Sequence, residues 1–142
     1  RKGSVYKHYN DNNYYVYDIE LHTELPEVLV VYQELDNDSL IFLRPLDMFL
    51  EEAPTGEKNI TGQEYRFELN NNIYYEKKEL TPKNWYKHNK GMDYELLFTA
   101  IHTESSEEFI IYRSTYGEKK LFAKPKSMFL EDVEEKRLLQ VR

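Results

Sequence analysis

Hydrophobic and polar residues alternate along several short stretches of this chain, and a period of two is typical of β-strands. The aromatic and branched stretches Tyr14–Leu21 and Tyr94–Ile101 each predict one strand. A second strand is predicted after each of them, at Glu27–Glu34 and Glu107–Ser114. Apolar residues occupy both alternating sets of positions in these second strands, so we expect both of their faces to be covered.

A third strand is predicted at Ser39–Arg44 and again at Lys119–Lys124, after short links in which Asn and Gly favour a hairpin turn. Pro45 and Pro125 then end these strands, and each proline can open a single helical turn. The order strand, loop, strand, tight turn and strand predicts an antiparallel meander.

The helical turns carry apolar pairs, Met48-Phe49 and Met128-Phe129, three and four residues after each proline. We interpret these pairs as plugs at one end of a small barrel. The copies diverge in spacing beyond this point, and we predict their closing strands at Tyr65–Leu69 and Arg137–Val141.

These elements occur twice because the sequence is repeated with a shift of 80 residues. Residues 6–53 align with residues 86–133 without a gap, and 15 of these 48 positions are identical, whereas chance pairing would give roughly three. The repeat predicts an all-β protein made of two tandem small SH3-like barrels, each a meander plus one short helical turn. We place the first repeat at 1–70, a linker at 71–82 and the second repeat at 83–142. Because such small units bury little surface, we expect them to pack together.

Charge and composition then exclude several classes of function. The net charge of −7 argues against a binder of the nucleic-acid backbone, which needs a basic face, so we expect no nucleic-acid partner. No apolar run approaches the ~18 residues of a membrane span, and there is no signal-peptide pattern, so we expect no membrane partner. The chain has no cysteine, which excludes disulfides and thiolate sites and fits a reducing cytoplasm.

The four histidines all lie in the repeated positions, as His8 and His88 and as His22 and His102. Two His and one Glu in each unit could hold zinc or iron, but no spacing supplies a third histidine. We therefore predict no metal and no cofactor. The sequence contains no Gly-x-Ser-x-Gly motif and no Gly-rich phosphate loop, so we assign no catalytic residue.

The repeated polar residues give a candidate ligand site in each copy. The candidate residues are His22, Glu24, Tyr32 and Arg44 in the first copy and His102, Glu104, Tyr112 and Lys124 in the second. Each His-Thr-Glu segment ends one strand and each Arg or Lys ends another, so we expect Glu24 to face Arg44 and Glu104 to face Lys124. Arg holds a carboxylate through a planar fork, whereas Lys is a mobile point charge, so we expect the first copy to carry the functional pocket.

Three interpretations of this set stay open. In the first, the side chains at the strand end satisfy backbone groups of the loop and have only a structural role. In the second, they form a small polar pocket or a ligand-facing rim. Catalysis is the third.

The combination Tyr-Lys-His, His-Thr-Glu, Tyr and Arg-Pro-x-x-Met-Phe resembles a short bacterial domain family of unknown function. The resemblance covers nearly the whole chain, once per copy, and implies an SH3-type barrel with no assigned activity. The second copy departs from the pattern with Lys124 in place of Arg44, and it has Lys90-Gly91 where the first copy has Asn10-Asp11.

Two classes of function remain after these exclusions. The first is a non-enzymatic binding or interaction module for a protein or small-molecule ligand, with two SH3-like copies. The alternative is an accessory enzyme that processes a small molecule or nucleotide through His22 and Glu24. A shallow groove with an aromatic rim would favour the binding module, and a deep enclosed pocket with a strongly perturbed His pKa would favour the enzyme.

Overall fold

The computed structural model of the protein describes residues 1–21, 23, 26–37, 39–76, 80, 82–88, 93–118 and 120–136. Within these residues the chain is mostly strand. The first repeat contains β1 (Val5–His8), β2 (Asn13–Leu21), β3 (Leu29–Glu34), β4 (Ile41–Pro45), α1 (Leu46–Phe49) and β5 (Phe67–Leu69). The second contains β6 (Asn84–His88), β7 (Asp93–His102), β8 (Glu108–Ser114), β9 (Phe122–Pro125), α2 (Lys126–Asp132) and β10 (Val133–Lys136). Neither described helix is long and apolar enough to cross a membrane.

The two repeats share one strand order, β5-β1-β2-β3-β4 in the first and β10-β6-β7-β8-β9 in the second, and all pairs within a repeat are antiparallel. Their registers coincide after a shift of 80 residues, since Tyr14 pairs with Glu34 as Tyr94 pairs with Ser114. In both repeats the pairing register also shifts by one residue at the same place, after Val16 in β2 and after Leu96 in β7. The predicted meander and its repetition are confirmed.

The copies differ at their closing strands. His8 pairs with Phe67, whereas His88 pairs with Val133, so the offset between equivalent residues falls from 80 to 66. The second repeat lacks the long loop of the first because α2 runs directly into β10. The closing strand predicted at Arg137–Val141 lies outside the described residues, and the structure forms this strand earlier in the chain. The opening strands β1 and β6 were not predicted, since each is only four or five residues long.

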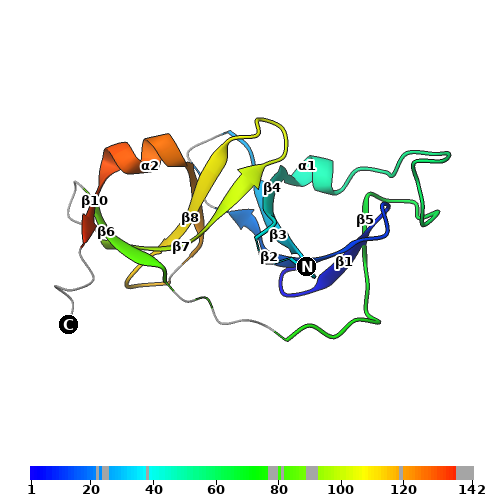
Figure 1. The fold of residues 1–142 in the computed structure, drawn as a ribbon, viewed down its shortest axis with the longest axis horizontal. Coiled ribbons are helices and arrows are strands. Elements are labelled where there is room, and N and C mark those ends of the chain that lie inside the picture. Colours follow the sequence, from blue (N-terminus) through cyan, green and yellow to red (C-terminus); the bar gives the residue numbers. More distant parts are fainter. Residues whose placement is uncertain are drawn as a thin grey trace.

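One open sheet runs through both repeats. Strand β4 pairs in parallel with the end of β7, where Phe42 lies opposite Ile101 and Leu43 lies opposite His102. The two units therefore lie side by side, each with its short helix on the same side of the molecule (Figure 1). The all-β class with two short helices is confirmed.

A shared core lies between the repeats and is built from both of them. It consists of Leu21, Leu29, Val31, Ile41, Leu43, Leu97, Phe98, Ala100, Phe109, Ile111, Leu121 and Ala123. One face of β3 and the equivalent face of β8 contribute Leu29, Val31, Phe109 and Ile111, and all four side chains are at most 1% exposed. This confirms that the repeats pack together.

The opposite faces of β3 and β8 enter a separate small core in each repeat. In the first repeat this core consists of Tyr14, Val16, Val30, Tyr32, Phe49 and Phe67. Phe49 and Phe129 are buried as predicted for the plugs, and Phe49 stacks on Phe67 with ring centroids 4.1 Å apart. Met128 is 38% exposed, so the methionine of the second plug was wrongly assigned to the interior. It lies one residue before Phe129 and therefore points away from the side of α2 that faces the core.

Candidate functional site

His102 lies at the boundary between the repeats, where it holds a turn. Its Nδ1 accepts hydrogen bonds from the backbone N–H groups of Glu104 (3.1 Å) and Ser105 (3.2 Å). Its Nε2 lies 2.9 Å from Oε1 of Glu27, a residue of the first repeat. The residue is 5% exposed, so His102 is a buried link within the fold rather than part of an open pocket.

The other candidates of the second copy occupy different environments. Glu104 is exposed and Lys124 is buried. Tyr112 is buried in the small core of the second repeat, where its ring stacks on Phe122. The expected pairing of Glu104 with Lys124 stays a prediction.

In the first copy the structure brings Tyr32 and Arg44 together. Arg44 is diagonal to Tyr32 across the β3–β4 ladder, because Val30 pairs with Arg44 and Tyr32 pairs with Phe42. The Nε of Arg44 donates to the hydroxyl of Tyr32 at 2.9 Å. Burial raises the pKa of the Tyr32 hydroxyl, and the positive charge of Arg44 opposes that rise. His22 and Glu24, the other two candidates of this copy, lie outside the described residues.

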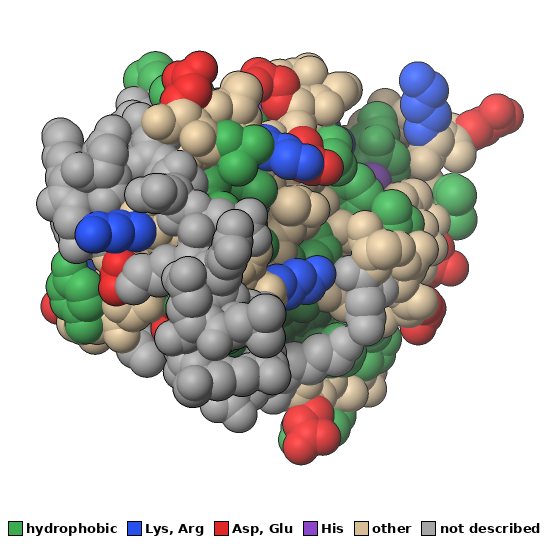
Figure 2. Space-filling model, turned by 60° about the vertical axis from the view of Figure 1, so that its left-hand side comes forward, with side chains coloured by type: hydrophobic (Ala, Val, Ile, Leu, Met, Phe, Trp, Pro, Cys, Tyr) green, Lys and Arg blue, Asp and Glu red, His purple; other side chains and the backbone are tan. Residues whose placement is uncertain are grey.

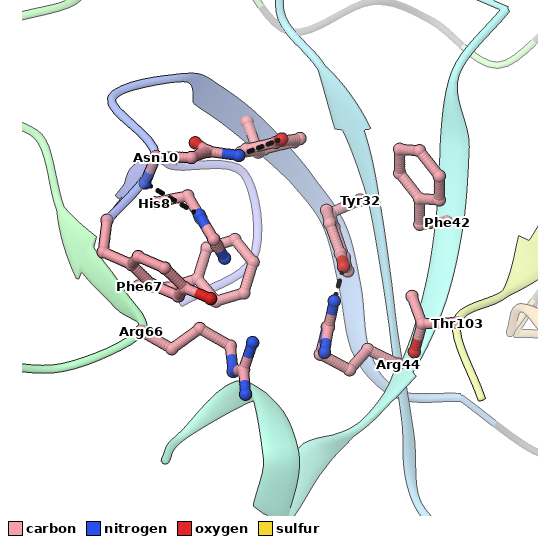
Figure 3. Close-up of a pocket in the computed structure, with 10 residues that line it drawn as sticks. His8, Asn10, Tyr32, Phe42, Arg44, Arg66, Phe67 and Thr103 are labelled. Carbon is pink, nitrogen blue, oxygen red and sulfur yellow. Dashed lines mark hydrogen bonds between the residues drawn. The ribbon is translucent and has the colours of Figure 1, made fainter. Parts of the chain in front are cut away.

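Tyr32 and Arg44 line a cavity of about 230 Å³ in the first repeat. The lining residues are His8, Tyr9, Asn10, Tyr14, Tyr32, Phe42, Arg44, Arg66, Phe67 and Thr103 (Figure 3). Aromatic rings therefore form much of the wall, and two guanidinium groups lie at its edge. None of these described lining residues is acidic. We call this cavity the first-repeat pocket.

Arg66 immediately precedes β5, and its hydrogen-bond partners lie outside the first-repeat pocket. Its Nε donates to the backbone carbonyl of Met48 at 3.1 Å, and its Nη2 lies 3.1 Å from Oε2 of Glu51. These partners leave Nη1 of Arg66 without a bond within the described part of the chain. In Figure 3 the guanidinium group points towards His8 and the interior of the pocket.

His8 contributes an imidazole to the same wall and is 8% exposed. Its Nδ1 accepts the backbone N–H of Asn10 at 3.0 Å, so the neutral ring carries its proton on Nε2. Burial lowers the pKa of His8 to about 4, and the positive charges of Arg66 and Arg44 act in the same direction. The ring is therefore neutral at pH 7 and offers the pocket a donor.

Thr103 reaches the first-repeat pocket from the second repeat. Its backbone N–H donates to the carbonyl of Leu43 at 2.8 Å, which continues the parallel β4–β7 ladder by one residue. Because neighbouring residues in register share a face of the sheet, Thr103 lies on the side of Arg44. The buried Oγ of Thr103 has no hydrogen-bond partner among the described residues.

The second repeat does not reproduce the chemistry of this pocket. Lys124 replaces Arg44 by sequence and register. Because Phe67 and Val133 are equivalent in the closing strands, the position before them changes from Arg66 to Asp132. Val133 and Asp132 of the second repeat thus stand where the first repeat has Phe67 and Arg66.

Sequence reasoning missed His8, Arg66, Phe67 and Thr103 as pocket residues. His8 was singled out by its repetition and considered only as a metal ligand, and Thr103 entered only as the middle residue of the second His-Thr-Glu segment. Arg66 carried no signal, because the copies are out of register there and repetition could not mark it. Thr103 belongs to the pocket only through the contact between repeats.

Two further observations concern metal-ligating and basic side chains among the described residues. No three His, Asp or Glu side chains gather there as a metal site would require. Figure 2 shows the molecule turned so that the second repeat comes forward, and the Lys and Arg side chains described on that face lie apart from one another. They form no continuous basic patch on this face.

The fold and the pocket together define a class of protein, a tandem repeat of small five-stranded β-units joined through one sheet and carrying a pocket in the first unit. The chain belongs to the family described as protein of unknown function DUF1653, which matches residues 4–69 and 84–142. The suspected family and its two tandem copies are thereby confirmed. No curated protein and no solved structure matches the chain.

Proposed function

We propose that the chain is a non-enzymatic binding module and that its site, the first-repeat pocket, takes a small anionic ligand with an apolar or aromatic body. The observation that carries this proposal is the pairing of two guanidinium groups, those of Arg44 and Arg66, with a wall of aromatic rings. Arg is suited to carboxylate and phosphate groups because its planar fork donates two parallel hydrogen bonds. Rings from Tyr14, Phe42 and Phe67 would cover the apolar body of the ligand.

The positive charges are held in place before any ligand arrives. Tyr32 orients Arg44, while Met48 and Glu51 orient Arg66. Preorganised donors lose less conformational entropy on binding, which favours affinity. Glu51 neutralises part of the charge on Arg66, but it is half exposed, so water weakens that effect.

One observation favours the alternative of an enzyme, namely the strongly lowered pKa of His8. The geometry argues against a role for His8 as a general base. Its Nδ1 lone pair accepts the Asn10 N–H, and its Nε2 carries the proton at neutral pH. The accessory enzyme expected from the sequence would act through His22 and Glu24, which the structure does not describe. We therefore prefer the binding module.

Nuclear magnetic resonance titration with two probes of opposite charge tests the proposal. Benzoate and benzylamine share a ring and differ in the sign of their charge. We expect benzoate to shift the backbone amide signals of β1, β4 and β5, and benzylamine to leave them unchanged, because the pocket is cationic. Equal shifts with both probes, or shifts confined to other strands for every anion tried, would contradict the proposed site.

A pair of variants assigns the effect to the pocket charge. Arg66→Gln removes one guanidinium group and should weaken benzoate binding by about tenfold, the loss expected for one charge-assisted contact. Lys58→Gln removes one positive charge from an exposed position outside the pocket and should leave binding unchanged. Equal weakening by both variants would mean that net charge, and not the pocket, controls binding.

Several sequence-based expectations stay within this proposal. The repeat limits are 1–70 and 83–142, joined by a linker at 71–82. We keep a cytoplasmic location because the chain has no cysteine, and we expect no nucleic-acid partner because its net charge is −7.

A further inference from the structure

We infer that the first-repeat pocket is a composite site for a phosphoryl group, in which Thr103 of the second repeat joins Arg44, Arg66 and His8 of the first. This inference rests on the proposed function and specifies its ligand. It also assigns different roles to the two repeats, since one carries the pocket and the other completes its wall.

The first step is the number of donors that face the pocket without a partner among the described residues. Among the described residues, Arg44 bonds only through its Nε, which leaves both terminal nitrogens. Arg66 leaves Nη1, and His8 leaves Nε2–H. A phosphoryl group carries three strong acceptor oxygens, whereas a carboxylate carries two. The larger number of acceptors matches this set of donors better.

The second step is the hydroxyl group of Thr103. A buried hydroxyl without a hydrogen bond is unfavourable, and such groups are uncommon in folded proteins. This one lies on a residue that lines the pocket and that shares a sheet face with Arg44. A ligand oxygen in the pocket would give the hydroxyl its missing partner. The position of Thr103 is fixed by the backbone bond to Leu43 and does not depend on the ligand.

The third step is the contrast with the second repeat. Asp132 stands where the first repeat has Arg66, so the second repeat lacks that guanidinium group. Lys124 stands in place of Arg44 and lacks the planar fork. We therefore expect one phosphoryl site per chain.

Isothermal titration calorimetry with phenyl phosphate, benzoate and inorganic phosphate tests the inference. Phenyl phosphate should bind with a stoichiometry of one and at least about tenfold more tightly than benzoate, because it fills more of the donors. If inorganic phosphate binds as tightly as phenyl phosphate, the phosphoryl site is supported and free phosphate is its ligand. Benzoate binding as tightly as phenyl phosphate, or two sites per chain, would overturn the inference. Failure of all three anions to bind would contradict the proposed function itself.

Matched variants test the contribution of the second repeat. Thr103→Val keeps the shape of the side chain and removes the hydroxyl, and it should weaken phenyl phosphate binding by about tenfold. Thr23→Val makes the same change at the equivalent position of the first repeat, which does not line the pocket, and should leave binding unchanged. Equal affinity of Thr103→Val and the wild type would remove Thr103 from the site while leaving the proposed function intact.

A measurement on the wild-type protein keeps the inference testable if a variant fails to fold. The second ionisation of a phosphate monoester has a pKa of about 6. Two guanidinium groups favour the dianion, so the phosphorus resonance of bound phenyl phosphate should titrate at lower pH than that of the free compound. A bound resonance that titrates at the same pH as the free one would overturn the placement between Arg44 and Arg66.

Discussion

The stability of the protein depends on pH through the protonation of His8, a residue of the first-repeat pocket. In the folded chain its pKa is lowered to about 4 by burial, whereas an unfolded histidine has a pKa of about 6.5. Between these values the unfolded chain binds more protons than the folded one, so stability is lost as pH falls from about 6.5 towards 4. At pH 7 this contribution is fully present.

We therefore predict that the free energy of unfolding falls by at most about 3 kcal/mol between pH 7 and pH 4 through His8 alone. Urea unfolding of the wild type and of His8→Gln at several pH values measures the effect. The difference in stability between the two proteins should shrink as pH falls. A difference that is the same at pH 7 and pH 4 would show that His8 titrates normally in the fold.

The candidate residues show how far sequence reasoning reaches at this scale. Tyr32 and Arg44 were predicted to belong to one candidate site because of their places in the meander, although only Tyr32 is identical in both copies, and the structure joins them. His102 was predicted in the same role as His22, but in the second repeat it is buried against Glu27. The sequence could not show this, because a repeated residue meets a different neighbour in each copy.

At the scale of elements, the end of β7 holds the two repeats together. Leu43 and His102 lie opposite each other in the parallel ladder, and His102 also contacts Glu27 across the boundary. Because His102 accepts two backbone N–H groups as well, its removal leaves two partly buried donors of the turn without their partner.

We predict that His102→Ala lowers the free energy of unfolding by about 2–4 kcal/mol and Glu27→Ala by about 1 kcal/mol. A double-mutant cycle should give a coupling energy of about 1 kcal/mol between them. Glu107→Ala changes an exposed side chain in the same loop and serves as the control. A coupling energy near zero would mean that the Glu27–His102 contact adds nothing to the joining of the repeats.

Strands were more predictable than the pairing between them. The long strands of each meander were predicted within a few residues, since apolar alternation and the 80-residue shift support each other there. The parallel contact between β4 and β7 leaves no sequence pattern, because it involves two residue pairs and depends on how the repeats pack. The closing strand of the second repeat was also beyond reach, since a shorter connection replaces the long loop of the first.

At the scale of the whole molecule, the shared core makes the two repeats one folding unit. Each repeat alone would expose the side of its sheet that the other repeat covers, including Val31 in the first and Ile111 in the second. Burial of such apolar surface is the main stabilising contribution in a small domain. The repeats should therefore unfold together.

We predict a single unfolding transition, with the fluorescence of Trp85 in the second repeat changing together with the amide signals of β2 in the first. Leu43→Ala and Ile111→Ala each remove a fully buried side chain from the shared core and should lower stability by about 2–5 kcal/mol. Both substitutions should move both probes equally. Separate transitions, with each substitution moving only the probe of its own repeat, would contradict a common core.

The central claim is that the ligand of this protein is an anion held in the first-repeat pocket, and a crystal structure of the wild-type chain grown with phenyl phosphate tests it most directly. The account predicts one molecule per chain, with the phosphoryl group between Arg44 and Arg66, within hydrogen-bond distance of Thr103, and the ring against Phe42 or Phe67. Density for phenyl phosphate in the second repeat, or on the surface away from both guanidinium groups with the first-repeat pocket empty, would contradict it.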